Sequence, residues 1–338
     1  MNQLKTKKIA SALFVLSLSA CTSIPKDGGL SNVSSLVESK LSAGVQLPSL
    51  SNNNQLTADA VFSLLAQPLS IVDAEKLALG FNPMVKVKLF KVGLAEADYA
   101  QAGRMENPGF SYARVSGQAY EASLLFDIGG VILMPLKRQL ENRRLQSARY
   151  QAASDVLEHI ANTRRSWINA VAAKQQTALM LKALESAEAG NNLTRQMSAL
   201  GHSNVIEAAD SEMFLSGMRT SLTRQRLAES AARESLIRQL GLWGQQARLL
   251  KLPDRLPELP QNSIDIESVE GQAIENRLDV RMANMNIEGL AKNLKLTRLN
   301  PFFSAIELGP VMEKGEGEIN RGYELEFRIP IFDTGDIK

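Results

Sequence analysis

The most regular pattern in this sequence is a stripe of apolar positions that alternate at spacings of four and three residues. The stripe lies in a stretch without proline, from Leu136 to Leu240. Such spacing is typical of long helices that pack nearly parallel, and proline would interrupt them. Lys174 and Thr177 leave gaps in it. Its members are Val156, Ile160, Thr163, Trp167, Ala170, Leu181 and Leu184, followed after Gly201 by Leu215, Met218, Leu222, Ala232 and Leu236.

The stripe breaks at Ala199–Asn204, where we predict the tip of an antiparallel helical hairpin. Gly201 can end the first helix, and the small polar residues behind it can cap the second. Gly190 is an alternative break, but we prefer Gly201 because a fresh apolar run starts at Val205. The first arm, Leu136–Ala199, would be about 96 Å long. An arm of that length needs a bundle, a partner coil or a tube wall to cover it.

Four shorter stretches show the alternation of β-strands. We predict strands at Pro108–Ser116, Ala122–Met134, Phe302–Met312 and Tyr323–Ile331, with a turn at Gly117–Glu121. A strand of a soluble sheet can alternate in this way, but a membrane β-barrel strand must, with apolar residues on lipid and polar residues on the lumen. Four strands cannot close a barrel, and open strand edges are not tolerated in lipid, so several chains would each contribute four strands.

The last predicted strand has the clearest two faces. One face is apolar and would touch lipid, whereas the other is mostly charged and would face the lumen, where its mixed signs give no clear ion preference. The lipid-facing residues would be Tyr323, Leu325, Phe327 and Ile329, and the lumen residues would be Glu324, Glu326 and Arg328.

The order of elements suggests an internal repeat. A helix starts at Ser70, restarts at Asn82-Pro83 and ends near Arg104, and a second runs from about Ile264 to Leu299. Each is followed by Asn-Pro, a strand pair and a proline, at offsets of 193 to 195 residues. The alternative is that two Asn-Pro pairs fall in these places by chance.

These elements predict a mainly α chain with a membrane β portion. The predicted organisation is a signal peptide (1–20), an N-terminal tether (21–66), the helices of the first repeat (67–106), a strand pair (107–134), the long hairpin (135–241), a loop-rich connector (242–268), the helix of the second repeat (269–299), a second strand pair (300–332) and the start of a second long helix (333–338).

The N-terminus predicts a lipid-anchored exported protein. Three lysines precede a short apolar segment, Ile9–Leu18, that ends in Leu18-Ser19-Ala20-Cys21. This tetrapeptide resembles a bacterial lipobox, in which the cysteine carries lipid; the alternative is an ordinary signal peptide with a coincidental cysteine. By the same resemblance, Thr22 favours sorting to the outer membrane. The Ser-, Asn-, Gly- and Pro-rich residues that follow suggest a loosely packed tether.

Composition excludes several classes of function. Of 38 basic side chains three lie in the signal peptide, so 35 face 36 acidic ones in the processed chain, a formal charge of −1. This balance implies no nucleic-acid partner. One cysteine and two histidines make a poor metal set, and no catalytic constellation is visible, so we expect neither an enzyme nor a cofactor. We also expect His159, Arg143-Arg144 and Arg164-Arg165 on solvated helix faces, and Trp167 in packing.

Taken in order, these features resemble the outer-membrane factor family, the TolC-like efflux ducts, over about Ser70–Lys338. The features that carry the resemblance are Leu69–Ala74 leading to Asn82-Pro83, the Asn107-Pro108 and Asn300-Pro301 strand entries, the Ala199–Gly201 tip leading to Val205–Ala208, and the turn Ile329–Gly335.

The resemblance implies a homotrimer in which each protomer gives four strands to one twelve-stranded transmembrane β-barrel and its long helices to a periplasmic α-barrel. It implies passive export of small molecules, drugs or metal ions, received from an inner-membrane pump through a periplasmic adaptor protein. The protein would sit in the outer membrane, anchored by lipid at Cys21, with a large periplasmic part. The family's second helical hairpin has no counterpart before Lys338, so we expect a fragment or a truncated product.

The hairpin tip is the predicted docking site for the adaptor. A turn so far from the membrane end must face solvent or another protein, and its small residues would let a helical tip approach closely. The residues concerned are Leu200, Gly201, His202 and Ser203. The alternative is a solvated turn without a partner. At the level of the whole protein, the alternative to a duct is a structural or adaptor-like coiled-coil lipoprotein.

Overall fold

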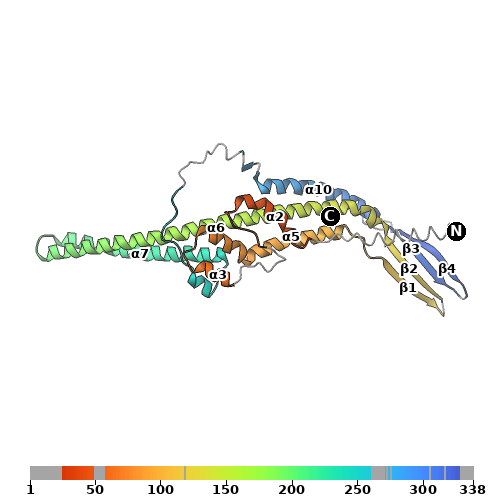
Figure 1. Ribbon diagram of the computed structural model, residues 1–338, viewed down its shortest axis with the longest axis horizontal. Coiled ribbons are helices and arrows are strands. Elements are labelled where there is room, and N and C mark those ends of the chain that lie inside the picture. Colours follow the sequence, from red (N-terminus) through yellow and green to blue (C-terminus); the bar gives the residue numbers. More distant parts are fainter. Residues whose placement is uncertain are drawn as a thin grey trace. The chain divides into compact units, whose positions relative to one another are not determined.

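The computed structural model describes residues 25–48, 58–117, 119–259, 271, 273–274, 276–303, 306–315 and 317–327. The chain forms two units. One contains Met1–Leu30, Phe90–Ala152 and Arg277–Lys338, and the other contains Ser31–Leu89 and Ala153–Asn276. In the ribbon of Figure 1 the first unit carries the strands, and we call it the strand unit; the other is the helical unit.

Helices dominate the described residues. Two of them, α6 with 72 residues and α7 with 36, form the predicted long hairpin. The helices are α2 (Leu30–Val37), the short 3-10 helix η1 (Glu38–Lys40), α3 (Ala58–Leu65), α4 (Ile71–Gly80), α5 (Pro83–Ala102), α6 (Ile128–Ala199), α7 (Val205–Leu240), α8 (Gln245–Leu249) and α10 (Leu278–Phe303).

The turn between α6 and α7 lies where the sequence predicts it. Gly201 has a φ of 78°, a left-handed conformation that glycine adopts without strain. The Gly201 N–H donates to the Ser198 carbonyl (3.1 Å) and the His202 N–H donates to the Met197 carbonyl (2.8 Å), which completes a Schellman end. Asn204 then caps α7, since its Oδ1 accepts from the Glu207 N–H at 2.7 Å. Gly190 lies inside α6 and causes no break.

The helical unit has a continuous apolar core. Trp167 is 3% exposed and its Nε1 donates to the carbonyl of Leu69 at 2.9 Å, so it serves packing, as the sequence suggests. The stripe positions around it are buried as well, from Val156 to Ala170. The core consists of Val61, Leu65, Leu69, Ala74, Leu77, Ala78, Trp167, Ala170, Val171, Leu236, Ile237, Leu240, Leu242, Leu250 and Leu252.

The predicted tether is partly wrong. Residues 25–48 include α2, whose Val33 and Val37 are completely buried, and α3 supplies Val61 and Leu65 to the core. Composition misled the prediction, because a few apolar residues at helical spacing suffice for packing among many polar ones. Residues 1–24 and 49–57 lie outside the described residues, and with them Cys21.

Two residues predicted on solvated helix faces, Arg164 and His159, are instead only partly exposed. Arg164 pairs with Glu75, whose side chain is fully buried, at a distance of 2.6 Å from Nε to Oε1. The Ser42 hydroxyl also donates to Glu75, at 3.0 Å. His159 is half-buried, its Nε2 has no hydrogen-bond partner in the structure, and burial together with the nearby Lys88 lowers the pKa of its imidazole. Both residues contact elements distant in sequence, which local pattern cannot predict.

The described strands form one antiparallel sheet in the order β1-β2-β3-β4 (Figure 1). Their bounds are Gly109–Ser116 for β1, Ala119–Asp127 for β2, Ile306–Lys314 for β3 and Ile319–Phe327 for β4. All three pairings are antiparallel, so both hairpin turns lie at the same end of the sheet. We call this the hairpin end.

The predicted second strand, Ala122–Met134, is too long. β2 ends at Asp127, and α6 begins at once with Ile128. The reason is a helix cap: Asp127 Oδ1 accepts a hydrogen bond from the Gly130 N–H at 2.7 Å. Pro135 lies inside α6 and does not open it, at the cost of one backbone hydrogen bond.

The two Asn-Pro pairs are not equivalent. Asn107-Pro108 lies between α5 and β1, whereas α10 continues through Asn300-Pro301 and ends at Phe303, so β3 starts at Ile306 and not at Phe302. A proline in the last turn removes only one hydrogen bond of a helix that is about to end. β4 starts at Ile319, four residues before the predicted Tyr323. Both repeats nevertheless show the order helix, strand, strand; residues 328–338, including Pro330 and the predicted second long helix, lie outside the described residues.

Polar contacts tie the helices of the strand unit together. Arg149 pairs with Glu96 at 2.9 Å, with both side chains largely buried, and the Ser147 hydroxyl donates to Asn286 on α10 at 2.9 Å. Arg143 and Arg144, predicted to be solvated, pair with Glu288 and Glu141. None of the helices in the described part of the chain is both long and apolar enough to cross a membrane.

Candidate functional site: a two-faced sheet

The strand register divides the sheet into two faces of opposite chemistry. Tyr112 pairs with Ala122, Ala122 with Met312, and Met312 with Arg321, and side chains alternate on either side of this row. One face therefore carries the even-numbered residues of β1, β2 and β3 and the odd-numbered residues of β4. We call it the apolar face, and the opposite one the acidic face.

The apolar face is broad, and the described residues leave most of it uncovered. Tyr323 is 87% exposed, Phe110 72% and Leu325 67%. Burying such a side chain contributes about 1.5–3 kcal/mol. Leaving this many of them exposed to water is therefore unfavourable. The face consists of Phe110, Tyr112, Tyr120, Ala122, Leu124, Phe126, Ile306, Leu308, Pro310, Met312, Ile319, Tyr323, Leu325 and Phe327, with three basic residues near one end.

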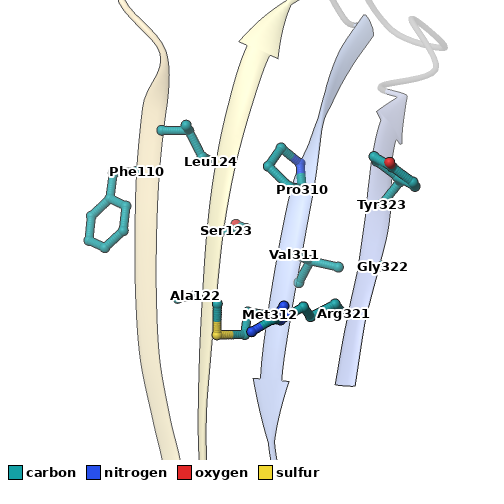
Figure 2. Close-up of a pocket in the computed structure, with 10 residues that line it drawn as sticks. All are labelled: Phe110, Ala122, Ser123, Leu124, Pro310, Val311, Met312, Arg321, Gly322 and Tyr323. Atoms are coloured by element: carbon teal, nitrogen blue, oxygen red, sulfur yellow. The ribbon is translucent and has the colours of Figure 1, made fainter. Parts of the chain in front are cut away.

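Figure 2 shows the middle of the sheet, where Phe110, Leu124, Pro310 and Tyr323 come from four successive strands. Together with Met312 they border a shallow hollow of about 390 Å³. Strand propensity alone does not explain Pro310 here, because proline cannot donate to a neighbouring strand. The hollow has mostly apolar walls and belongs to the same exposed surface.

The opposite face is polar and strongly acidic. Glu324 and Glu326 are half-buried on it, opposite Gly309 and Glu307 of β3. Ser123 of β2, on the same face, is buried. The acidic residues are Glu121, Asp127, Glu307, Glu313, Glu324 and Glu326. Within the described strands this face holds acidic residues and no basic one. Arg328, on which the expected mixture of charges depends, lies outside the described residues together with Ile329.

Three basic residues stand at the margin of the apolar face, next to the hairpin end. Arg114 and Lys314 lie in one row with Tyr120 between them, and Arg321 lies one row further in, opposite Met312. The Lys314 ammonium lies 5.8 Å from the centre of the Tyr120 ring, and Tyr112 stacks on Tyr120 with ring centres 5.9 Å apart. Sequence reasoning missed this margin because it becomes visible only once the register is known.

The second candidate site is the hairpin tip. Leu200 is 74% exposed, Val205 80% and Ile206 72%, and a Cβ added to Gly201 would meet nothing within 4 Å. His202 is exposed, and the Ser203 hydroxyl donates to Glu207. The tip thus combines a small backbone turn with three large apolar side chains that are not covered by any part of the chain that the structure describes. Only Leu200 of these three was predicted as a site residue.

Chemical groups for catalysis do not converge in either place. In the ranges that the structure describes, no three or more histidine, cysteine, aspartate and glutamate side chains are grouped so as to hold a metal ion. Both candidate sites are surfaces. The sheet has one apolar and one acidic face, and the hairpin tip is small and apolar. What they offer is contact with lipid, water or another protein.

Together, the long helical hairpin, the shorter helices and the four-stranded sheet have the fold of the outer-membrane factors, the TolC-like channels. The expected fold class is therefore confirmed: the described chain is mainly α with a small antiparallel sheet of four strands, and its structural neighbours combine a helical barrel with a β-barrel. No protein-family model matches the sequence, and no curated protein matches it significantly. The evidence for the fold is structural.

Three solved structures illustrate the similarity. A membrane protein from Pseudomonas aeruginosa is 17% identical, with 78% of this chain and 68% of that chain covered and a TM-score of 0.62. CusC, whose structures were described in terms of folding and transmembrane channel formation, is 16% identical. The similarity covers 86% of this chain and 73% of that chain, with a TM-score of 0.62. The CmeC outer membrane channel of Campylobacter jejuni is 15% identical, with 78% and 62% covered and a TM-score of 0.64.

Proposed function

We propose that this chain is the outer-membrane channel component of a tripartite efflux system, a passive duct for small molecules such as drugs or metal ions. The observation that carries the proposal is the sheet with one broad, uncovered apolar face and one acidic face, on a chain with the fold of outer-membrane channels. A membrane barrel strand has this alternation because one face meets lipid and the other meets water.

The edges of the sheet support a trimer. β1 and β4 each pair on one side only among the described strands, and unpaired strand edges do not persist in lipid. Four strands are too few to close a barrel, so copies of the chain would join β4 of one protomer to β1 of the next. Three copies give the twelve strands that the resemblance implies.

The two faces then receive distinct roles. Tyr323, Leu325 and Phe327 would contact outer-membrane lipid, whereas Glu324 and Glu326 would line a water-filled lumen. An acidic lumen favours the passage of cations and neutral molecules over anions. A passive duct takes its substrates from the pump, so the identity of the cargo depends on the inner-membrane partner.

The tip at Gly201 would meet the periplasmic adaptor protein. Its uncovered apolar residues offer a surface to another helical tip, and Gly201 allows the backbone to approach closely. Lipid on Cys21, proposed from the lipobox alone, would anchor the N-terminus. A Cys21→Ser variant should then fail to incorporate labelled palmitate, and labelling of that variant would refute the anchor.

The test of the duct is channel formation by the intact chain in a Gram-negative host. We expect outer-membrane extracts to contain an oligomer that migrates differently before and after heating, and that conducts ions in planar bilayers. The matched control is a chain with Leu325→Lys and Phe327→Lys, which keeps the helices but charges the apolar face. If the chain is found only in the periplasmic fraction, stays soluble without detergent and conducts no ions, the result would instead favour an adaptor-like lipoprotein.

A further inference from the structure

The basic residues at the margin of the apolar face form a short row that the proposed duct does not by itself explain. Arg114 lies on β1, Lys314 on β3 and Arg321 on β4. Neighbouring strands are 4.7–4.9 Å apart, so the Cα atoms of Arg114 and Lys314, two strands apart, are separated by about 10 Å. Arg321 lies diagonally across from Lys314 on the adjacent strand, at about 7–8 Å. Three cations therefore stand within one narrow band across the sheet.

On the described strands the band has no acidic residue on its own face. The acidic residues of the described strands lie on the opposite face, and none of the ion pairs found among the described residues involves Arg114, Lys314 or Arg321. Arg114 donates from Nε and Nη2 to the Gly117 carbonyl, at 3.1 and 2.7 Å, which fixes its side chain and leaves Nη1 available. The Lys314 ammonium is held over the Tyr120 ring.

The position of the band is as informative as its charge. On one side of it lies the exposed apolar face, and on the other side lie the two hairpin turns. Along the strands the surface changes from apolar side chains to tyrosine and then to cations within a few residues. A lipid molecule changes in the same order, from its acyl chains to its phosphate. Long basic side chains extend toward such an interface, and arginine binds phosphate with paired N–H groups.

We propose that Arg114, Lys314 and Arg321 bind the phosphate groups of anionic lipid headgroups, where the apolar face leaves the bilayer at the hairpin end. The inference rests on the proposed function, because it needs the sheet to be inserted in a membrane. An acidic protein partner would match the charge of the three cations but not the exposed apolar face beside them. Soluble phosphate would match the charge as well, and the experiment distinguishes it from lipid.

The experiment measures the selectivity of the inserted protein for lipids. The intact chain is reconstituted in phosphatidylcholine vesicles with a trace of spin-labelled phosphatidylglycerol or spin-labelled phosphatidylcholine, and the immobilised fraction of each is compared. We expect a severalfold preference for phosphatidylglycerol. An R114Q/K314Q/R321Q variant should lose it, since a cation near the surface is worth about fivefold in binding. The matched control R195Q/R224Q/R226Q removes three exposed charges from the helical hairpin and should keep the preference.

Insertion itself is scored first, so the two proposals fail separately. Absence of immobilised lipid of either kind would contradict the duct, whereas equal immobilisation of both lipids by the unmodified chain would overturn the phosphate row alone. An unchanged preference in the triple variant would also overturn it. If the triple variant does not insert, the single Arg321→Gln change, at an exposed side chain, must reduce the preference. Loss of the preference in inorganic phosphate, relative to chloride at equal ionic strength, would assign the row to soluble phosphate.

Discussion

The two units of the chain differ in how far their apolar side chains are buried. In the helical unit Trp167, Leu236 and Leu240 are completely or almost completely buried against the chain's own residues. In the strand unit Tyr323, Leu325 and Phe110 are mostly exposed, although they are as apolar as a protein core. The helical unit is thus stabilised by its own packing. The described residues do not cover the apolar face of the sheet, and in the proposed duct lipid and neighbouring copies would cover it.

The largest effect should follow from opening the core of the helical unit. Trp167→Ala removes the indole and its hydrogen bond to the Leu69 carbonyl and leaves a cavity among buried leucines. We expect a loss of about 3–5 kcal/mol in the free energy of unfolding, measured by denaturant titration. Leu179→Ala, at a side chain that is 69% exposed on the same helix, is the control and should cost far less. Equal losses would show that the core is not where the structure places it.

A charge on the apolar face should have the next largest effect. Phe327→Arg would place a cation in lipid, and we expect barrel stability to fall by about 2–4 kcal/mol if the site is near the membrane centre. Glu326→Arg, one residue away on the acidic face, should cost little. The measurement is the amount of heat-modifiable oligomer in the outer membrane. If the sheet tolerates both changes equally, its two faces do not differ in surroundings.

A smaller effect should come from acidification, and it should be confined to the helical unit. Burial lowers the pKa of His159 in the folded chain below its usual value near 6.5, and Lys88, which pairs with Asp155 at 3.8 Å, lowers it further. The unfolded chain therefore takes up the proton first, so the stability contributed by neutral His159 is present above pH 6.5 and declines as the pH falls. His159→Gln should flatten this decline between pH 7 and 5 in denaturant titrations. A decline of the same steepness in the variant would exclude His159 as its source.

The smallest effect on stability, but a large effect on export, is expected at the tip. Gly201→Trp adds bulk where a Cβ would meet nothing within the chain. Gly201→Ala is the matched control, because it carries the same strain at a φ of 78° without the bulk. We expect both variants to assemble, and export by the Trp variant alone to fail. Normal export with Trp at position 201 would leave the tip as a solvated turn.

Local signals in the sequence predicted the long hairpin well. The turn at Gly201 depends on a glycine, a capping asparagine and the apolar stripe, all within a few residues of one another. The predicted start of α6 was wrong. The apolar run after Asp127 is equally typical of a strand, but the Asp127 cap starts a helix there. Pairings across the chain were out of reach: Glu75 and Arg164 are 89 residues apart, and each alone resembles a surface residue.

The candidate site was predictable only strand by strand. The alternation at Tyr323–Phe327 is visible in the sequence, but the continuity of the apolar face depends on the register between β2 and β3, which are about 180 residues apart. The acidity of the opposite face and the basic residues at the margin of the apolar face follow from the same register. No local pattern encodes it.

The account depends most on the claim that the apolar face of the sheet lies in lipid and the acidic face in water. Single spin labels on cysteines at positions 323 to 327, in a Cys21→Ser background reconstituted in vesicles, test this residue by residue. We predict that labels at 323, 325 and 327 collide with oxygen dissolved in the bilayer, whereas labels at 324 and 326 collide with a water-soluble nickel complex. Access of the nickel complex to all five positions would contradict the claim.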